Sequence, residues 1–146
     1  MDRVPPALVP QLDADVPADG LTIGEAAAVV GLSVETLRYY EREGLLLDPA
    51  ARRSNGHRRF RRADLDWLAG LVMLRETGMP IARIREIAAI SRTPGSERER
   101  LEVLQTHRDA VVARLEQTRR HLVALDTKIA AYRAYVGDEE DAIHDD

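Results

Sequence analysis

The sequence contains no cysteine, and this absence removes several kinds of chemistry from consideration. Without thiols the chain forms no disulfide, binds no metal through thiolate and senses no oxidant at a thiol. Long apolar runs are also missing, because the longest stretches without a charged residue are nine residues long, at 4–12 and 26–34. A membrane-spanning helix needs about 18 or more mostly apolar residues. The sequence therefore predicts no transmembrane segment.

The first 20 residues lack the features of a secretion signal. They hold one arginine, four aspartates and four of the seven prolines, in place of a basic start followed by an apolar run. We therefore expect a cytoplasmic protein. The same composition, with little periodic hydrophobicity, predicts a disordered N-terminal arm over residues 1–20. A length of 146 residues leaves room for one small domain with an appendage.

The net charge of −4 is unevenly distributed along the chain. Residues 1–20 carry one basic and four acidic side chains, a net charge of −3. Residues 21–92 carry 12 basic and nine acidic side chains, a net charge of +3. Residues 93–146 carry eight basic and 12 acidic side chains, a net charge of −4. Six arginines fall between Arg52 and Arg62. A basic stripe of this kind on an acidic chain is what phosphate binding requires. Arginine makes up 20 of the 21 basic residues, which suits phosphates and base edges, although codon bias in a GC-rich genome explains this equally well.

Capping signals predict two short helices at the start of the ordered chain. A capping box at residues 22–25 begins a helix over 23–30. Ser33 is placed to cap a second helix over 34–43, and a glycine ends each helix. The three-residue turn between the two helices is typical of a helix-turn-helix.

Turn signals and two further helices follow. An Asn-Gly pair at 55–56, between short arginine-rich segments, predicts a two-stranded hairpin of 51–53 against 58–60. This hairpin would form a wing beside the helices. Apolar periodicity then predicts a third helix over about 64–76 with a wide apolar face, and a fourth over 81–91.

The clearest periodicity lies in the last third of the chain. A capping box at 96–99 opens a long helix that we expect to end near Val136, before a frayed acidic tail over 137–146. Steps of three and four residues from Leu101 meet apolar side chains at nine of eleven positions, a heptad seam typical of a coiled coil. No other segment has enough apolar surface to cover this seam, so we expect a second copy to cover it. The predicted dimerisation residues are Leu101, Leu104, Val111, Leu115, Leu122, Leu125, Ile129 and Tyr132.

Several motifs follow one another in the first two thirds of the chain. They are Ile-Gly-Glu-Ala-Ala at 23–27 leading to Gly-Leu-Ser at 31–33, Thr-Leu-Arg-Tyr-Tyr-Glu at 36–41 before Gly-Leu-Leu at 44–46, the arginine-rich 52–60, and Leu-Arg-Glu-Thr-Gly at 74–78. In this order and spacing they resemble the mercury-resistance-regulator (MerR) family of bacterial transcription factors. His57 and Phe60 stand where the family's wing usually has tyrosines. The resemblance covers residues 21 to about 92, and the long helix is similar only in kind.

The resemblance implies an all-α fold with a small β wing. It implies a winged helix-turn-helix domain over 21–92 and a homodimer held by an antiparallel coiled coil of the helices over 96–136. It also implies binding to a dyad-symmetric promoter operator, bending and untwisting of the spacer DNA, and RNA polymerase as a partner at the promoter. By their positions in the family motifs, Arg38 and Tyr39 contact DNA, and Arg52 and Arg58 grip phosphates.

Helical spacing agrees with the first of these assignments. If Leu37 and Tyr40 face inward, the outer face of the second helix is left with Glu35, Thr36, Arg38 and Tyr39. The predicted DNA-binding residues are therefore Glu35, Thr36, Arg38, Tyr39, Arg52, Arg53, Asn55, Gly56, His57, Arg58 and Arg59. Core packing is the alternative for Tyr39, and a solvated charged surface is the alternative for the arginine cluster.

Residues suited to metal binding or catalysis are few and scattered. His107 and His121 lie 14 residues apart on one predicted helix, so one subunit cannot bring both to a single ion. No Ser, His and acid set stands in a catalytic context, and no glycine-rich phosphate loop occurs. We therefore expect no metal, no cofactor and no enzymatic activity.

A small-molecule effector remains compatible with the sequence. The antiparallel packing implied by the family would bring the C-terminal end of the long helix to the partner's winged domain. The candidate effector residues are Trp67, His107, Tyr132 and Tyr135. The alternative is that Trp67 belongs to the core and Tyr132 to the seam.

Two other functions remain open. One is an architectural or excisionase-like DNA-bending protein that controls no promoter. The other is a coiled-coil interaction module whose basic patch binds an acidic protein.

Overall fold

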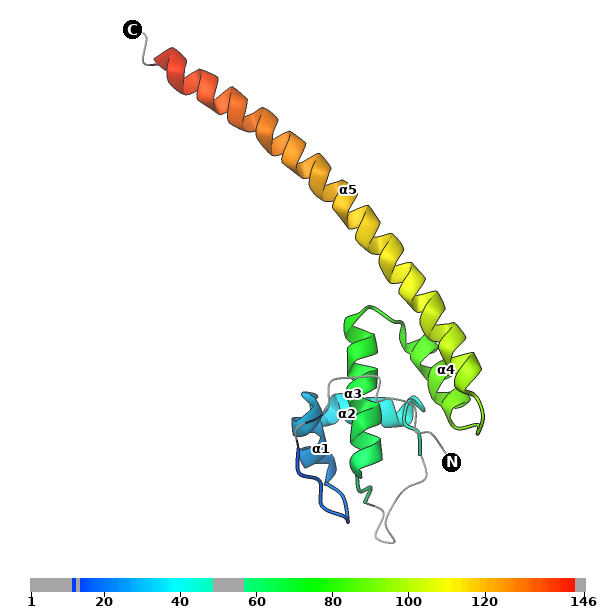
Figure 1. Ribbon diagram of the computed structural model, residues 1–146. Coiled ribbons are helices and arrows are strands. Elements are labelled where there is room, and N and C mark those ends of the chain that lie inside the picture. Colours follow the sequence, from blue (N-terminus) through cyan, green and yellow to red (C-terminus); the bar gives the residue numbers. More distant parts are fainter. Residues whose placement is uncertain (1–11, 13, 49–56, 144–146) are drawn as a thin grey trace. The chain divides into compact units, whose positions relative to one another are not determined.

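The computed structural model describes residues 12, 14–48 and 57–143. Their secondary structure is a series of α-helices (Figure 1), namely α1 (Ile23–Val30), α2 (Val34–Arg42), α3 (Arg62–Glu76), α4 (Ile81–Ser91) and α5 (Glu97–Ile143). The mostly helical fold with a long C-terminal helix is confirmed. The chain divides into two units after Leu104. Across the described ranges, no helix has the length and apolar character needed to cross a membrane.

Local capping chemistry sets the starts of α1 and α2. The Thr22 hydroxyl accepts from the Glu25 amide at 3.2 Å, and the Glu25 carboxylate accepts from the Thr22 amide at 3.0 Å. The hydrogen bond from the Thr22 amide to the Glu25 carboxylate is the largest cause that lowers the pKa of Glu25, followed by the Thr22 side chain and the charge of Arg59. The capping box therefore stabilises α1 above the unfolded pKa and loses that effect as the pH falls through the folded pKa. At α2 the Ser33 hydroxyl accepts from the Thr36 amide at 3.1 Å.

Two apolar clusters form the core of the N-terminal unit. The first joins α1, α2 and the start of α3, and it contains Leu21, Ala26, Ala27, Val30, Leu37, Leu46, Phe60, Leu65 and Leu68. The second joins the end of α2 to α3 and α4, and it contains Tyr40, Leu45, Leu71, Leu74, Met79, Ile84 and Ile87. Because the inward side of α2 contributes to both clusters, its opposite side is held toward solvent.

The segment before α1 lies against this core, which differs from the disordered arm predicted through residue 20. The Arg62 guanidinium donates to the carbonyl oxygens of Leu12 at 2.8 Å and Ala14 at 3.0 Å. Arg59 Nη2 donates to the Gly20 carbonyl at 2.7 Å. The two arginines thus satisfy backbone oxygens that a mobile arm would leave to water.

The wing predicted from the Asn-Gly turn is only partly within the described residues. Its first strand, 51–53, and the turn at 55–56 lie outside them. Where both partners are described, the β pairing is one antiparallel bridge between Leu21 and Phe60, with N–H···O distances of 2.7 and 2.8 Å. Phe60 therefore pairs with the chain that enters α1.

The bridge brings the backbone so close to Gly20 that a side chain there would collide. Gly20 has φ +83°, and an added Cβ would lie 2.8 Å from the Phe60 carbonyl oxygen. We expect Gly20→Ala to lower the free energy of unfolding by roughly 1–3 kcal/mol in urea denaturation. The control is Gly24→Ala in α1, where an added Cβ meets nothing within 4 Å. This control should raise the free energy of unfolding by about 0.5–1 kcal/mol, and equal effects at the two sites would contradict the close approach.

The long helix α5 continues beyond its predicted end near Val136. It runs through Gly137 as far as Ile143. A single glycine in a helix is only about 1 kcal/mol less favourable than alanine, which is too little to stop an established helix. At the other end Ser96, predicted to cap α5, donates its hydroxyl to the Ile90 carbonyl at 2.7 Å. Ser96 therefore links the end of α4 to the start of α5.

Candidate nucleic-acid interface

One face of α2 is polar and open to solvent. Leu37 is fully buried and Tyr40 is 7% exposed, as their inward spacing predicts. The opposite side carries Glu35, Thr36, Arg38 and Tyr39, of which Thr36 is half-buried and the others are exposed. The structure therefore brings together the four DNA-binding residues predicted on this helix.

The first turn of α2 holds one of these side chains in place. The Ser33 hydroxyl donates to Thr36 Oγ1 at 2.9 Å and accepts from the Thr36 amide at 3.1 Å. The N-terminal residues of the second helix are those that helix-turn-helix proteins direct at base edges. The Thr36 hydroxyl is therefore held in place at the N-terminal end of α2, where such contacts are made.

Tyr39 lies on the surface and rests on its neighbour. It is 39% exposed, and its ring centroid is 6.0 Å from that of Tyr40 at an interplanar angle of 50°. Core packing, the alternative left open by the sequence, does not describe this position. Contact with the buried Tyr40 restricts the partly exposed ring of Tyr39.

The arginines that follow the undescribed segment have partners within the protein. The Arg58 side chain is 3% exposed, with its guanidinium 3.6 Å from the Asp64 carboxylate and 5.0 Å from the centroid of the Phe60 ring. Arg59 lies 3.5 Å from the Asp19 carboxylate. In these positions both side chains are engaged inside the N-terminal unit, whereas the sequence places them on a DNA-binding surface.

The buried position of Arg58 is the larger departure from the prediction. A phosphate contact would require its guanidinium to leave both Asp64 and Phe60. Sequence reasoning missed the internal role because arginine is almost never fully buried unless it is paired, and its partner lies in the next helix. Of the other predicted wing contacts, His57 is exposed. Four lie outside the described residues, namely Arg52, Arg53, Asn55 and Gly56.

A substitution at Arg58 separates a role in stability from a role in phosphate binding. We expect Arg58→Met to lower the free energy of unfolding by roughly 1–3 kcal/mol, because the Asp64 carboxylate loses its cation. The dependence of DNA affinity on salt should stay unchanged, because no phosphate contact is removed. Urea denaturation and DNA titrations at several salt concentrations measure the two quantities. Unchanged stability with a salt slope lower by about 1 would restore the phosphate role.

Trp67, a predicted effector residue, is part of the core. Its indole N–H donates to the Leu45 carbonyl at 2.8 Å, and the side chain packs against the second apolar cluster. The alternative of core packing therefore describes Trp67. The other effector candidates lie on α5, where His107 is half-buried and Tyr132 and Tyr135 are each 63% exposed.

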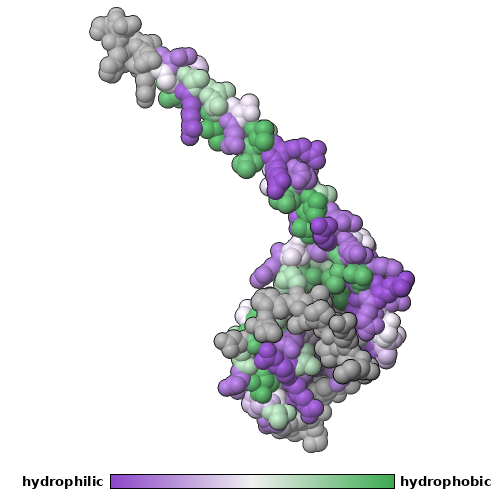
Figure 2. Space-filling view, in the orientation of Figure 1, coloured by the Kyte–Doolittle hydropathy of each residue, from purple (hydrophilic) through white to green (hydrophobic). Residues whose placement is uncertain are grey.

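Beyond its first turns, α5 exposes apolar side chains along its length. Every residue from 112 to 139 is exposed in the single chain, and Figure 2 shows hydrophobic side chains in patches along this helix. The exposed seam residues are Leu101, Leu115, Leu122, Leu125, Ile129, Tyr132 and Val136. Leu104 differs, because it packs against the second cluster of the N-terminal unit. A stripe of this extent marks a surface that another molecule covers.

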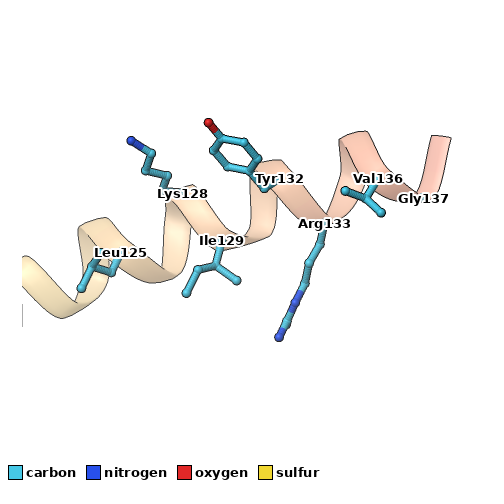
Figure 3. A pocket seen from close by; sticks show the side chains of 7 residues that line it. All are labelled: Leu125, Lys128, Ile129, Tyr132, Arg133, Val136 and Gly137. Carbon is cyan, nitrogen blue, oxygen red and sulfur yellow. The ribbon is translucent and has the colours of Figure 1, made fainter. Parts of the chain in front are cut away.

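A shallow hollow lies near the C-terminal end of α5 (Figure 3). Its lining is Leu125, Lys128, Ile129, Tyr132, Arg133, Val136 and Gly137. Lys128 and Tyr132 rise from one side of the helix, and Ile129 and Arg133 extend from the other. All the lining residues come from one helix, so the hollow has no opposite wall within this unit.

In the ranges 12, 14–48 and 57–143, no cluster of three or more His, Asp or Glu side chains has the arrangement to hold an ion.

Comparisons with known proteins match most of the chain. Residues 21–89 match a family model described as MerR HTH family regulatory protein. An uncharacterized helix-turn-helix-type transcriptional regulator of Haemophilus influenzae is 34% identical over 113 residues, which span 77% of this chain and 83% of the relative.

Two solved structures extend the similarity to the arrangement of the helices. A protein from Listeria monocytogenes assigned to the MerR family of transcriptional regulators has a TM-score of 0.74 and 31% identity, over 86% of this chain and 96% of that one. HiNmlR, a MerR family regulator lacking the sensor domain and bound to promoter DNA, has a TM-score of 0.65 and 35% identity, over 77% of this chain and 90% of that one.

Proposed function

Because the chain belongs to the MerR family of transcriptional regulators, we propose that it binds promoter DNA as a homodimer and controls transcription there. The observation that carries the proposal is the polar outer face of α2, which follows a three-residue turn after α1. Supporting it is the 35% identity to HiNmlR, whose structure is described as bound to promoter DNA. The similar proteins are transcriptional regulators, and we propose no catalytic role for this chain.

In this proposal α2 enters the major groove and reads base edges. The residues assigned to reading are Glu35, Thr36, Arg38 and Tyr39, which are the side chains that α2 turns away from the core. Phosphate contacts are assigned to the wing residues Arg52, Arg53, Asn55, Gly56 and His57. Arg58 and Arg59 are left out of this set because each already binds an aspartate within the protein. The DNA-binding domain then spans residues 21–92.

The long helix supplies the contact between subunits. The exposed seam of α5, from Leu101 to Val136, is the apolar surface that a second copy would cover. We assign it to an antiparallel coiled coil over residues 96–136. Joining two DNA-binding domains makes the second half-site contact effectively intramolecular. A dimer with two-fold symmetry predicts an operator with dyad symmetry.

Control of transcription follows from the family's way of acting on promoters. We propose that the dimer bends and untwists the spacer between promoter elements and so acts on RNA polymerase. A small-molecule effector would bind beside Tyr132, where a partner could close the hollow at the end of α5. His107 and Tyr135 are the other effector candidates on the same helix. Trp67 is left out because its indole N–H is already bound to Leu45.

Selection of binding sites from a random pool of duplex DNA tests this function. We expect the full-length protein to enrich one sequence arranged as an inverted repeat. Affinity for that sequence should exceed affinity for random duplex of the same length by at least about 10³-fold. A pool that stays random after repeated rounds, with equal affinity for every duplex, would contradict sequence-specific regulation.

A further inference from the structure

Four consecutive backbone carbonyls after α2 accept hydrogen bonds from side chains of other helices. They belong to residues 43–46, which we call the connector because they lead from α2 toward the predicted wing. Carbonyls at the end of a helix have no partner within it and are usually left to water or a cap. Here each of these carbonyls accepts a hydrogen bond from a tryptophan of α3, an arginine of α4 or the arginine that caps α4. The connector is thus fixed at every residue.

Arg85 of α4 holds the first residue of the connector. Its Nε donates to the Glu43 carbonyl at 2.9 Å, and its Nη2 binds the Glu43 carboxylate. Glu43 is the C-cap of α2, so this contact attaches the C-terminal end of the proposed recognition helix to α4. The two residues lie 42 positions apart in the sequence.

Arg92, at the C-cap of α4, holds two further carbonyls. Its Nη2 donates to the Gly44 carbonyl at 2.6 Å and also to the Leu46 carbonyl, to which its Nε donates at 3.2 Å. The carbonyl between them, that of Leu45, accepts from the Trp67 indole at 2.8 Å. The fork of one guanidinium therefore spans the connector, which a single ammonium group could not do.

These contacts fix how the C-terminal end of α2 lies relative to α4. We propose that Arg85 and Arg92 are positioning residues for DNA binding, which orient the recognition helix through the connector without contacting DNA. The inference rests on the proposed function, because it concerns how the DNA-reading face is placed. Arg92 also stands four residues before Ser96, which links the end of α4 to α5 through Ile90. The connector thus lies next to the junction with the long helix.

The chain offers a matched control on the same helix. Arg83 of α4 has a side chain 55% exposed, and it pairs with Glu86 of its own helix at 2.8 Å. Its replacement removes the same charge from α4 and leaves the connector untouched. A second comparison is Arg92→Lys, which keeps the positive charge but loses the planar, forked set of N–H donors of the guanidinium. A lysine would preserve a phosphate contact but not the three hydrogen bonds of the guanidinium to the connector.

The experiment uses full-length protein and the duplex that the wild-type chain enriches from a random pool. Affinity for this duplex and for random duplex is measured at several salt concentrations, for Arg92→Gln, Arg92→Lys, Arg85→Gln and Arg83→Gln. Circular dichroism first establishes a temperature at which each variant is fully folded. Amide hydrogen exchange of the DNA-free, full-length protein, read out on a proteolytic peptide that spans residues 43–48, measures how firmly the connector is held.

We expect Arg92→Gln and Arg92→Lys to weaken binding to the selected duplex about tenfold, because the forked hydrogen bonds that hold the connector are lost. Arg85→Gln should act in the same direction, which keeps the test valid if an Arg92 variant fails to fold. Binding to random duplex and the salt slope should stay at their wild-type values, and the connector should exchange faster. Arg83→Gln should match the wild type in every measurement.

Two results would overturn the inference while leaving the proposed function intact. One is wild-type affinity for the selected duplex in folded Arg85 and Arg92 variants, which would reduce both arginines to a stabilising role. The other is a salt slope lower by about 1 in Arg92→Gln that Arg92→Lys restores, which would make Arg92 a phosphate contact. If the wild-type chain enriches no sequence, the proposed function fails and the inference fails with it.

Discussion

Leu122→Lys is expected to convert the protein from a dimer to a monomer. Leu122 lies on the seam of α5 and is 57% exposed in the single chain. Burying a leucine side chain contributes about 1.5–3 kcal/mol, and a symmetric dimer loses this twice. The dissociation constant of the dimer should therefore rise by at least about 100-fold. Sedimentation at micromolar protein measures it.

Val123→Lys is the matched control for this experiment. Val123 is the next residue of the same helix, it is 65% exposed, and it lies off the seam. This variant should remain a dimer. Monomeric Leu122→Lys should also bind the selected duplex much more weakly and with about half the salt slope, because each half-site is then contacted alone. Equal sedimentation of the two variants would show that α5 associates through another face or not at all.

Arg38→Ala is expected to change which DNA sequence the protein selects. Arg38 is exposed on α2, and it follows the buried Leu37 and precedes the exposed Tyr39 in the sequence. A bidentate arginine contact to a guanine is worth about 1–3 kcal/mol of discrimination against other bases. The variant should therefore lose roughly 5- to 150-fold of its preference at one position of each half-site. Repeating the selection with Arg38→Ala measures this preference.

Arg42→Ala controls for the loss of charge. Arg42 is exposed in the last turn of α2, at the opposite end from the residues expected to reach the bases. The Arg42→Ala variant should select the same DNA sequence as the wild-type protein, with at most a uniform loss of affinity for every duplex. An unchanged consensus for Arg38→Ala, with the same uniform loss, would mean that α2 lies along the phosphates without reading the bases.

Features set by neighbouring residues could be predicted from the sequence. The capping box of Thr22 and Glu25 and the cap at Ser33 are present as predicted, and so is the inward spacing of Leu37 and Tyr40. Each of them depends on residues no more than four positions apart. The family resemblance, drawn from short motifs in order, is confirmed by the match of residues 21–89.

The roles of the arginines could not be predicted in this way. Arg59 binds a carbonyl 39 residues away, Arg92 binds one 46 residues away, and Arg62 binds one 50 residues away. In the sequence these arginines are indistinguishable from ones that face phosphates. The count of basic residues therefore overestimated how many are free for DNA in the described part of the chain.

The helices, their order and the apolar seam of α5 could be predicted from the sequence alone, because capping and periodicity act over one or two turns. At Gly137 a local signal failed, because the glycine penalty is smaller than the stability of the helix that runs through it. The burial of Arg58 beside Asp64 and the contacts of Arg85 and Arg92 with the connector depend on the tertiary fold. A guanidinium can bind a carboxylate, a phosphate or a carbonyl, and its partner is the one that the fold brings within reach.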